Sequence, residues 1–285
     1  IDKNRFADEN WYLMAWGMGD AMNMVLFLEG QSPVPYKILC PPRNVNAIKF
    51  VLKNFIINPK CDEVVVYPLQ DGYPIPQEEV LTSTHGFGPW SIGVAHDLGK
   101  LKVVHTYPRA WSSINNLHGT GILKAIENFA NTNKTIEEKT CILFPERGDS
   151  YQFPDSFWDI IVSKLNEKGY KTYVNLSKKS DVYKNEKIFE GTYDLDKPEI
   201  EDLFQFIVKH KNLVTIGQRS GIFDALKYFD FRKIIFYPDV VDPEMPDKER
   251  TNVDDVIFVG DQYTKNTLDI CLSKYDKTML DFIIP

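Results

Sequence analysis

Cysteine is scarce in this sequence, and its spacing gives no support for a disulfide framework or a structural zinc site. The 285 residues include four cysteines, and none of them forms a C-x-x-C pair. Three lie within or beside apolar runs, which favours buried free thiols in a reducing compartment. The histidines show no H-x-x-x-H spacing, so no metal site is expected. The four cysteines are Cys40, Cys61, Cys141 and Cys271.

The sequence also lacks an excess of positive charge and a long apolar run. A formal net charge of −7 disfavours a nucleic-acid-binding protein, for which a basic surface would be expected. The most apolar N-terminal stretch, residues 11–28, is interrupted by Gly17, Gly19 and Asp20. We therefore expect neither a signal peptide nor a transmembrane helix there. The cysteine usage and the absence of such segments favour a cytoplasmic protein.

What the sequence does have is an alternation of short apolar strands with segments of helical spacing. Such an alternation predicts parallel sheets with right-handed crossovers, that is, an α/β fold. The polar segment 131–135 interrupts the pattern before it restarts, so we expect two Rossmann-like domains, 1–133 and 134–285. Strands are expected at residues 11–16, 36–40, 62–67, 101–106, 140–144, 171–176, 213–216 and 232–237.

Two parts of the pattern are less distinctive. In the first domain, the helical spacing of residues 21–29 puts Glu29 at an exposed end. The C-terminal segment 251–285 carries no recognisable motif. Within it, residues 264–272 predict a helix, and the segment could pack back across the N-terminal domain.

The stretch 212–226 is the most informative in the chain. A buried strand at residues 213–216 runs through Gly217 into a helix that opens at Ser220-Gly221. The first free N–H groups of such a helix, together with its dipole, attract phosphate. Arg219 in the turn adds a fork of donors suited to a diphosphate. An ordinary βα turn with a solvated arginine is the alternative interpretation.

A second strand–glycine–helix stretch lies near the start of the chain. Gly17-Met-Gly19 begins a G-x-G pattern, but the third glycine and the acidic residue after the second strand are missing. A dinucleotide fingerprint is therefore disfavoured. Asp20 has two interpretations: a helix-capping carboxylate, or a general base at the carboxyl edge of a parallel sheet, where ligands of such folds bind.

Two further features are a glycine-rich loop and a D-x-D pattern. Residues 84–90 form a glycine-rich aromatic loop containing His85, which could line a cleft on the acceptor side. Asp194-Leu-Asp196 forms a D-x-D pattern such as metal-dependent transferases use. It precedes Pro198 and a predicted helix, so capping of a helix start explains it better than metal binding.

The order of these segments resembles bacterial glycosyltransferases of the GT-B fold, nearest the heptosyltransferase-like group (glycosyltransferase family 9-like) and related capsule-locus proteins. Two positions depart from that group's D-[ST]-G-x-x-H motif, since Arg219 stands at the Asp and Asp224 at the His. The group's phosphate-binding lysine is absent, and Arg147 is the nearest candidate. The matching segments are 17–20, 142–148 with 153–154, 189–192, and 213–224.

The resemblance implies two Rossmann-like domains facing a cleft, and sugar transfer from a nucleotide-diphosphate donor without a bound metal or cofactor. Arg219 and the N–H groups at Ser220-Gly221 would neutralise the leaving diphosphate, and Asp20 would take the proton of the acceptor hydroxyl. Thr192 would contact the nucleoside. The implied nucleotide-sugar site consists of Gly17, Gly19, Arg147, Gly148, Thr192, Gln218, Arg219, Ser220, Gly221 and Asp224.

The resemblance therefore implies a glycosyltransferase that acts on a bacterial surface glycan or glycolipid, in capsule or lipopolysaccharide assembly. Such a protein would lie in the cytoplasm, with any membrane contact at the periphery of the inner membrane. The alternative is a non-catalytic nucleotide-sugar- or phosphate-binding module of the same fold, because the Asp and His of the turn motif are replaced. An oxidoreductase is disfavoured by the missing dinucleotide fingerprint.

Overall fold

The structure is a computed structural model of residues 1–285, and the chain divides into two compact units, residues 1–127 and 128–285. Each unit is a mixed α/β structure built on a parallel sheet, which confirms the predicted α/β class with parallel sheets. The described residues are 11–13, 18–40, 42–66, 102–103, 117, 119–131, 134–146, 153–176, 189–195, 198–237, 239–241, 249–251, 266–271 and 275–285.

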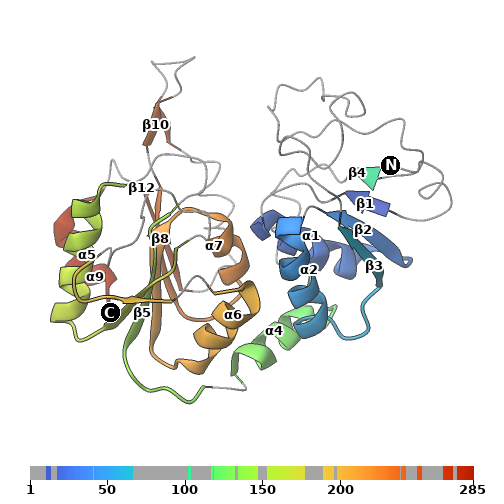
Figure 1. Ribbon diagram of the computed structural model, residues 1–285, viewed down its shortest axis with the longest axis horizontal. Helices are drawn as coiled ribbons and strands as arrows, with labels where there is room; N and C mark the ends of the chain where they lie inside the picture. The colour runs from blue at the N-terminus through green and yellow to red at the C-terminus, as the bar shows by residue number, and fades with distance from the viewer. Residues whose placement is uncertain are drawn as a thin grey trace. The chain divides into compact units, whose positions relative to one another are not determined.

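The first unit contains a four-stranded sheet in the order β3-β2-β1-β4, with all neighbours parallel. The first strand therefore lies inside the sheet, with the second strand on one side and the fourth on the other (Figure 1). The elements are β1 (Trp11–Leu13), α1 (Met18–Gln31), β2 (Tyr36–Cys40), α2 (Pro42–Asn54), β3 (Cys61–Val66), β4 (Lys102–Val103) and α4 (Ile122–Asn131), which continues into the second unit.

The expectation that Glu29 is exposed is wrong. Only 6% of Glu29 is accessible, because its carboxylate accepts hydrogen bonds from three groups at the start of the neighbouring strands. The Tyr36 hydroxyl donates at 2.8 Å, and the backbone N–H groups of Lys60 and Cys61 donate at 2.9 and 3.0 Å. The carboxylate thus ties the end of α1 to β2 and β3. Helical spacing alone carries no information about such tertiary partners.

The second unit contains a six-stranded sheet in the order β12-β9-β8-β5-β6-β7, and every neighbouring pair is parallel. A two-stranded antiparallel hairpin, β10 with β11, lies outside this sheet. The elements are β5 (Thr140–Phe144), α5 (Asp155–Glu167), β6 (Lys171–Val174), β7 (Tyr193–Asp194), α6 (Ile200–Lys209), β8 (Leu213–Gln218), α7 (Gly221–Leu226), β9 (Arg232–Tyr237), β10 (Asp239–Val241), β11 (Glu249–Thr251), β12 (Thr267–Cys271), η5 (Lys277–Met279) and α9 (Leu280–Ile283).

Helices cover both faces of the second sheet. In Figure 1, α5 and α9 lie on one side, and α6 and α7 lie on the other. The core beneath α5 joins Trp158, Ile161 and Leu165 of that helix to Ile216 and Phe236 of the central strands. A sheet buried on both faces explains why β5 and β8 are apolar runs without alternation.

The C-terminal segment differs from the predicted helix. Residues 267–271 form strand β12 rather than part of a helix, and they pair with β9 along its length. Among the final residues, Leu280, Ile283 and Ile284 belong to the core cluster of α5 within the second unit. The strand forms because β9 offers an open edge, a tertiary partner that helical spacing cannot detect.

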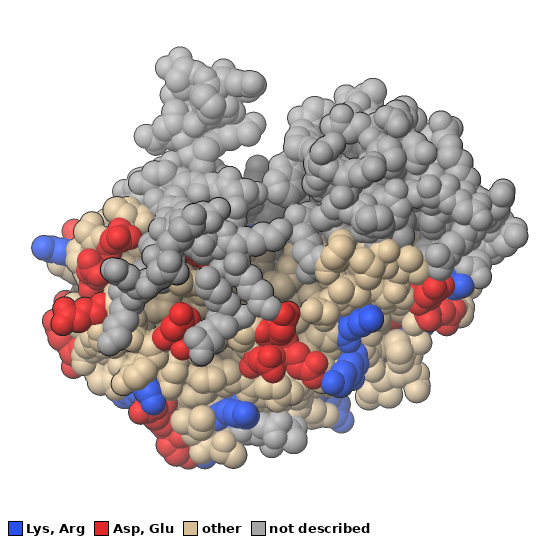
Figure 2. All heavy atoms as spheres, in the orientation of Figure 1, with Lys and Arg blue, Asp and Glu red and all other residues tan. Residues whose placement is uncertain are grey.

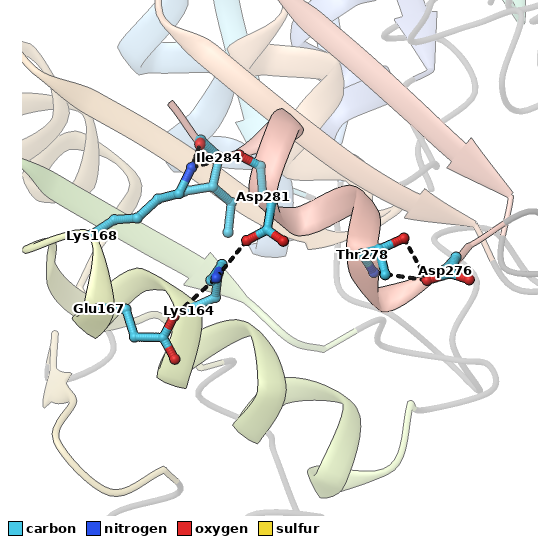
Figure 3. A network of polar contacts seen from close by, with 7 residues as sticks. All are labelled: Lys164, Glu167, Lys168, Asp276, Thr278, Asp281 and Ile284. Carbon is cyan, nitrogen blue, oxygen red and sulfur yellow. Dashed lines mark hydrogen bonds and ion pairs between the residues drawn. The ribbon is translucent and has the colours of Figure 1, made fainter.

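Polar contacts hold this C-terminal segment against α5 (Figure 3). Lys164 forms an ion pair with Asp281 at 2.5 Å and another with Glu167 at 2.9 Å. Lys168 donates from Nζ to the carbonyl oxygens of Asp281 and Ile284. These ion pairs lie at the surface, so each is expected to contribute less than about 1 kcal/mol. The apolar contacts of the segment are therefore its main anchor.

Gly217 is where β8 lies closest to β5 and α7. A Cβ atom at this position would lie 2.6 Å from the backbone oxygen of Phe144, 2.7 Å from Phe144 Cβ and 2.8 Å from Phe223 Cε2. Two of these neighbours belong to the facing strand and cannot rotate away. The rings of Phe144 and Phe223 meet edge to face with centroids 5.5 Å apart, so the contact continues beyond the glycine. Any side chain at this position would separate the strands or displace the helix.

Gly217→Ala is therefore expected to lower the free energy of unfolding by about 3 kcal/mol, because the added methyl group overlaps backbone atoms. Gly169→Ala is the matched control: Gly169 has φ +77°, but nothing lies within 4 Å of its would-be Cβ. The control should cost only about 1 kcal/mol of backbone strain. Urea unfolding of both variants measures the difference, and equal costs would contradict the close approach.

Candidate functional site

The order of strands in the second sheet creates a switch point between β5 and β8. From β5 the chain moves outward to β6 and β7, whereas from β8 it moves the other way to β9 and β12. The helices that follow these two strands, α5 and α7, lie on opposite faces (Figure 1). The segments leaving β5 and β8 must therefore diverge at the carboxyl edge of the sheet. Open α/β sheets bind ligands in the crevice that such a divergence leaves.

The turn from β8 to α7 lies at this switch point. Gln218 ends β8 with its side chain buried, and Gly217 pairs with Phe144, the last residue of β5. The Arg219 backbone N–H donates to the oxygen of Phe236 at 2.9 Å, and its Nη1 donates to the oxygen of Ser220 at 2.8 Å. The arginine is thus tied by its backbone to β9, and its guanidinium lies over the turn.

Ser220 and Gly221 open the helix in the predicted place. Ser220 has the extended backbone of an N-cap residue (φ −153°, ψ 166°), and its hydroxyl does not cap the helix. Gly221 is the first residue of α7. The helix is short and ends at Leu226. Because α7 is so short, its first-turn N–H groups, which have no intrahelical acceptor, contribute more to anion binding than its summed dipole does.

The end of β5 lies beside this turn, because Phe144 is paired with Gly217. Residues 144–146 are described, whereas Arg147 and Gly148 lie outside the described residues, so their role stays a prediction. The two loops that the sequence singled out therefore begin on adjacent strands.

Thr192 is not close to the turn. It immediately precedes β7, the edge strand, and its hydroxyl donates to the oxygen of Phe189 at 2.8 Å. Three strand spacings separate β7 from β8, or roughly 14 Å. Its contact with a nucleoside stays a prediction. Asp224 lies in α7, and its side chain is outside the described part of the structure.

The first unit has a comparable switch point. Strand β1 lies between β2 and β4, and α1 follows β1 with Gly19 and Asp20 in its first turn. Helix α1 already begins at Met18, so the second glycine of the G-x-G pattern lies within the helix. The side chain of Asp20, the whole of Gly17 and the His85 loop lie outside the described residues, so their roles stay predictions.

Two alternative kinds of site find no support among the described residues. No group of three or more His, Cys, Asp or Glu side chains there could hold a metal ion. Of the D-x-D pattern, Asp194 ends β7 while Asp196 is not described. In the described parts of the chain, no helix has the length and apolar character needed to cross a bilayer. On the face in Figure 2, basic side chains lie scattered among acidic ones.

Asp269 was missed by the sequence analysis. It lies on β12, and one of its carboxylate oxygens accepts a hydrogen bond of 2.9 Å from the hydroxyl of Tyr237, a fully buried residue at the end of β9. Burial raises the pKa of Asp269 to about 6, against the opposing effects of the Tyr237 hydrogen bond and the positive charge of Arg219. The sequence feature that could have identified Asp269 is that it is a single acidic residue within the short, mostly apolar run Thr267–Cys271.

The pH dependence of stability should reveal this carboxyl. Its pKa in the folded protein, about 6, exceeds the usual 3.8, so the folded state binds more protons than the unfolded state between these values. Stability is therefore lost as pH rises through that window. Asp269→Asn should remove this slope and raise the free energy of unfolding above pH 7 by about 2 kcal/mol.

The control is Asp159→Asn, which alters an exposed acid on α5. It should keep the wild-type slope. Urea unfolding at several pH values compares the three proteins, and parallel slopes for wild type and Asp269→Asn would show that Asp269 is not the group responsible.

Solved structures of similar fold were found. The E. coli heptosyltransferase WaaC with ADP aligns with a TM-score of 0.53 at 11% identity, over 96% of this chain and 96% of that one. WaaC with ADP-2-deoxy-2-fluoro heptose aligns with a TM-score of 0.51 at 10% identity, over 96% and 98%. A family 9 glycosyltransferase from Veillonella parvula DSM 2008 aligns with a TM-score of 0.48 at 10% identity, over 94% and 87%.

No protein-family model and no curated protein sequence matches this chain. The first two structural alignments nevertheless extend over nearly the whole length of both chains. They show that this chain shares the fold of the WaaC heptosyltransferase structures.

Proposed function

We propose that this protein is a glycosyltransferase that moves a sugar from a nucleotide-diphosphate donor to a hydroxyl of a bacterial surface glycan or glycolipid. The observation that carries the proposal is the position of the β8–α7 turn. An arginine and the first N–H groups of a helix stand at the switch point of a doubly wound sheet. The shared fold with heptosyltransferase structures, one of them with ADP, supports it.

In the proposed mechanism, the two units face a cleft that holds donor and acceptor. The N–H groups at Ser220 and Gly221 and the guanidinium of Arg219 stabilise the negative charge that develops on the departing diphosphate. Arg147, which follows β5, is the second cation of this site. Because these groups supply the positive charge, transfer needs no metal ion and no further cofactor.

The acceptor side of the proposed mechanism belongs to the first unit. Asp20, in the first turn of α1 at the switch point of that sheet, takes the proton of the acceptor hydroxyl as the oxygen attacks the anomeric carbon. The loop of His85 lines the acceptor side. Such an enzyme works in the cytoplasm, at the inner face of the membrane where glycolipid acceptors are exposed.

The experiment is a thermal-shift panel with ADP, UDP, GDP and CMP, each in magnesium and in EDTA. A ligand at 100 times its dissociation constant adds about 2.7 kcal/mol to stability, which gives a clear rise in Tm. One nucleoside diphosphate should stabilise the wild type equally in both conditions. Arg219→Ala should weaken its binding about tenfold or more, because a charge-assisted contact is lost.

Arg232→Ala is the control, since Arg232 begins β9 and therefore lies at the amino ends of the strands, away from the β8–α7 turn. It should bind like the wild type. Absence of any shift would refute the donor site. If a nucleotide sugar binds but no nucleoside diphosphate is released when acceptor extracts are added, the non-catalytic binding module is favoured. The replacement of the Asp and His of the family motif is the sequence feature that supports this alternative.

A further inference from the structure

Three polar residues, contributed by three adjacent strands of the second sheet or by the turn that follows one of them, lie on the same face. Arg219 follows β8, Tyr237 ends β9 and Asp269 lies on β12. The register pairs Gln218 with Phe236 and Ile235 with Asp269. Because side chains alternate along strands, Tyr237 and Asp269 share the face of Gly217, which α7 covers. The group thus lies beneath the β8–α7 turn.

The contacts within this group run from the turn to the sheet edge. The Arg219 N–H bonds the oxygen of Phe236, the residue before Tyr237. The Tyr237 hydroxyl then reaches across to Asp269 at 2.9 Å. Two strand spacings separate β8 from β12, or roughly 10 Å. The positive charge of Arg219 nevertheless acts on the half-buried carboxyl of Asp269 and lowers its pKa.

Among the described residues, two other charged groups near this face make contacts of their own. Lys233, at the amino end of β9, donates from Nζ to the oxygens of Phe229 and Phe231 at 2.5 and 2.8 Å. Lys227 in the turn after α7 places its Nζ 5.2 Å from the ring centroid of Tyr228. The ionised form of Asp269 is therefore favoured by Tyr237 and Arg219, and opposed by burial.

A diphosphate beside Arg219 would change this balance. It neutralises the arginine and brings two further negative charges toward Asp269, which disfavours the ionised carboxylate. Loss of a stabilising positive charge together with new repulsion is worth about a factor of ten in protonation at this distance. A diphosphate that binds Arg219 reduces the net positive charge near Asp269 and repels the carboxylate, so protonation of Asp269 is the expected effect.

We propose that Asp269 is a further residue of the donor site, and that it takes up a proton from solvent when a nucleotide diphosphate binds beside Arg219. The proton returns to solvent when the diphosphate leaves. Asp269 does not touch the donor; it acts through Arg219. Mild acidity therefore favours donor binding. Loss of the proton from Asp269 favours release of the nucleoside diphosphate. This inference rests on the proposed function, since it requires a diphosphate at Arg219.

Isothermal titration calorimetry tests the inference with ADP-glucose, UDP-glucose and GDP-glucose, using whichever binds most tightly. The phosphates of these compounds are diesters with no proton to exchange near neutral pH. Titrations at pH 6.5 in PIPES and in imidazole, buffers of different ionisation enthalpy, reveal proton uptake. The wild type should take up about half a proton per bound nucleotide. This is the value expected at pH 6.5 for a carboxyl with a pKa of about 6 whose affinity for protons rises about tenfold when the nucleotide binds.

Asp269→Asn should take up no proton, and at pH 8 it should bind the nucleotide sugar up to about tenfold more tightly than the wild type. Asp159→Asn, the exposed control on α5, should behave as the wild type. Tyr237→Phe keeps the carboxylate but removes the hydrogen bond that favours its ionised form, so the pH of maximum uptake should move upward. This variant carries the test if Asp269→Asn does not fold.

Two failures are distinguishable. If the wild type binds a nucleotide sugar but the heat is independent of the buffer, or if uptake persists in Asp269→Asn, the inference is overturned while the proposed function stands. If none of the three nucleotide sugars binds the wild type, the proposed function is overturned and the inference falls with it.

Discussion

The close approach of β5, β8 and α7 at Gly217 is the constraint on which the rest of the second unit depends. With Phe144 O only 2.6 Å from a would-be Cβ, this position excludes every side chain. The absence of a side chain lets the two strands at the switch point pair to their last residues and lets Phe223 pack against Phe144. The β8–α7 turn is held at the carboxyl edge as a result. Arg219 therefore emerges at a fixed place, beside the segment that leaves β5.

Much of this arrangement follows from local sequence. The apolar strand at 213–216, its terminating glycine and the Ser-Gly helix start were predicted because each depends on residues adjacent in the chain. The strand at 267–271 and the buried position of Glu29 were not, because each depends on partners far away. Strand β12 exists because β9 offers it an edge, and Glu29 is buried because the start of β3 donates hydrogen bonds to it. Asp269 was missed with its strand.

The charge balance at this edge of the sheet is the part of the account most specific to this chain. Where the resembled family has an acid in the turn, Arg219 supplies a positive charge, and an acid stands instead two strands away at Asp269. The sheet thus keeps both signs near the crevice but separates them by Tyr237. The half-buried carboxyl of Asp269 therefore responds to the charge that Arg219 meets.

Amide hydrogen exchange tests the location of the donor site most directly. The protein is exchanged with and without the nucleoside diphosphate that stabilises it, in EDTA, and peptides are resolved by mass spectrometry. The account predicts slower exchange in the peptides that contain residues 145–148 and 218–222, the two loops that leave the switch point. Protection confined to the β6–β7 edge of the sheet, or to the first unit, would contradict it.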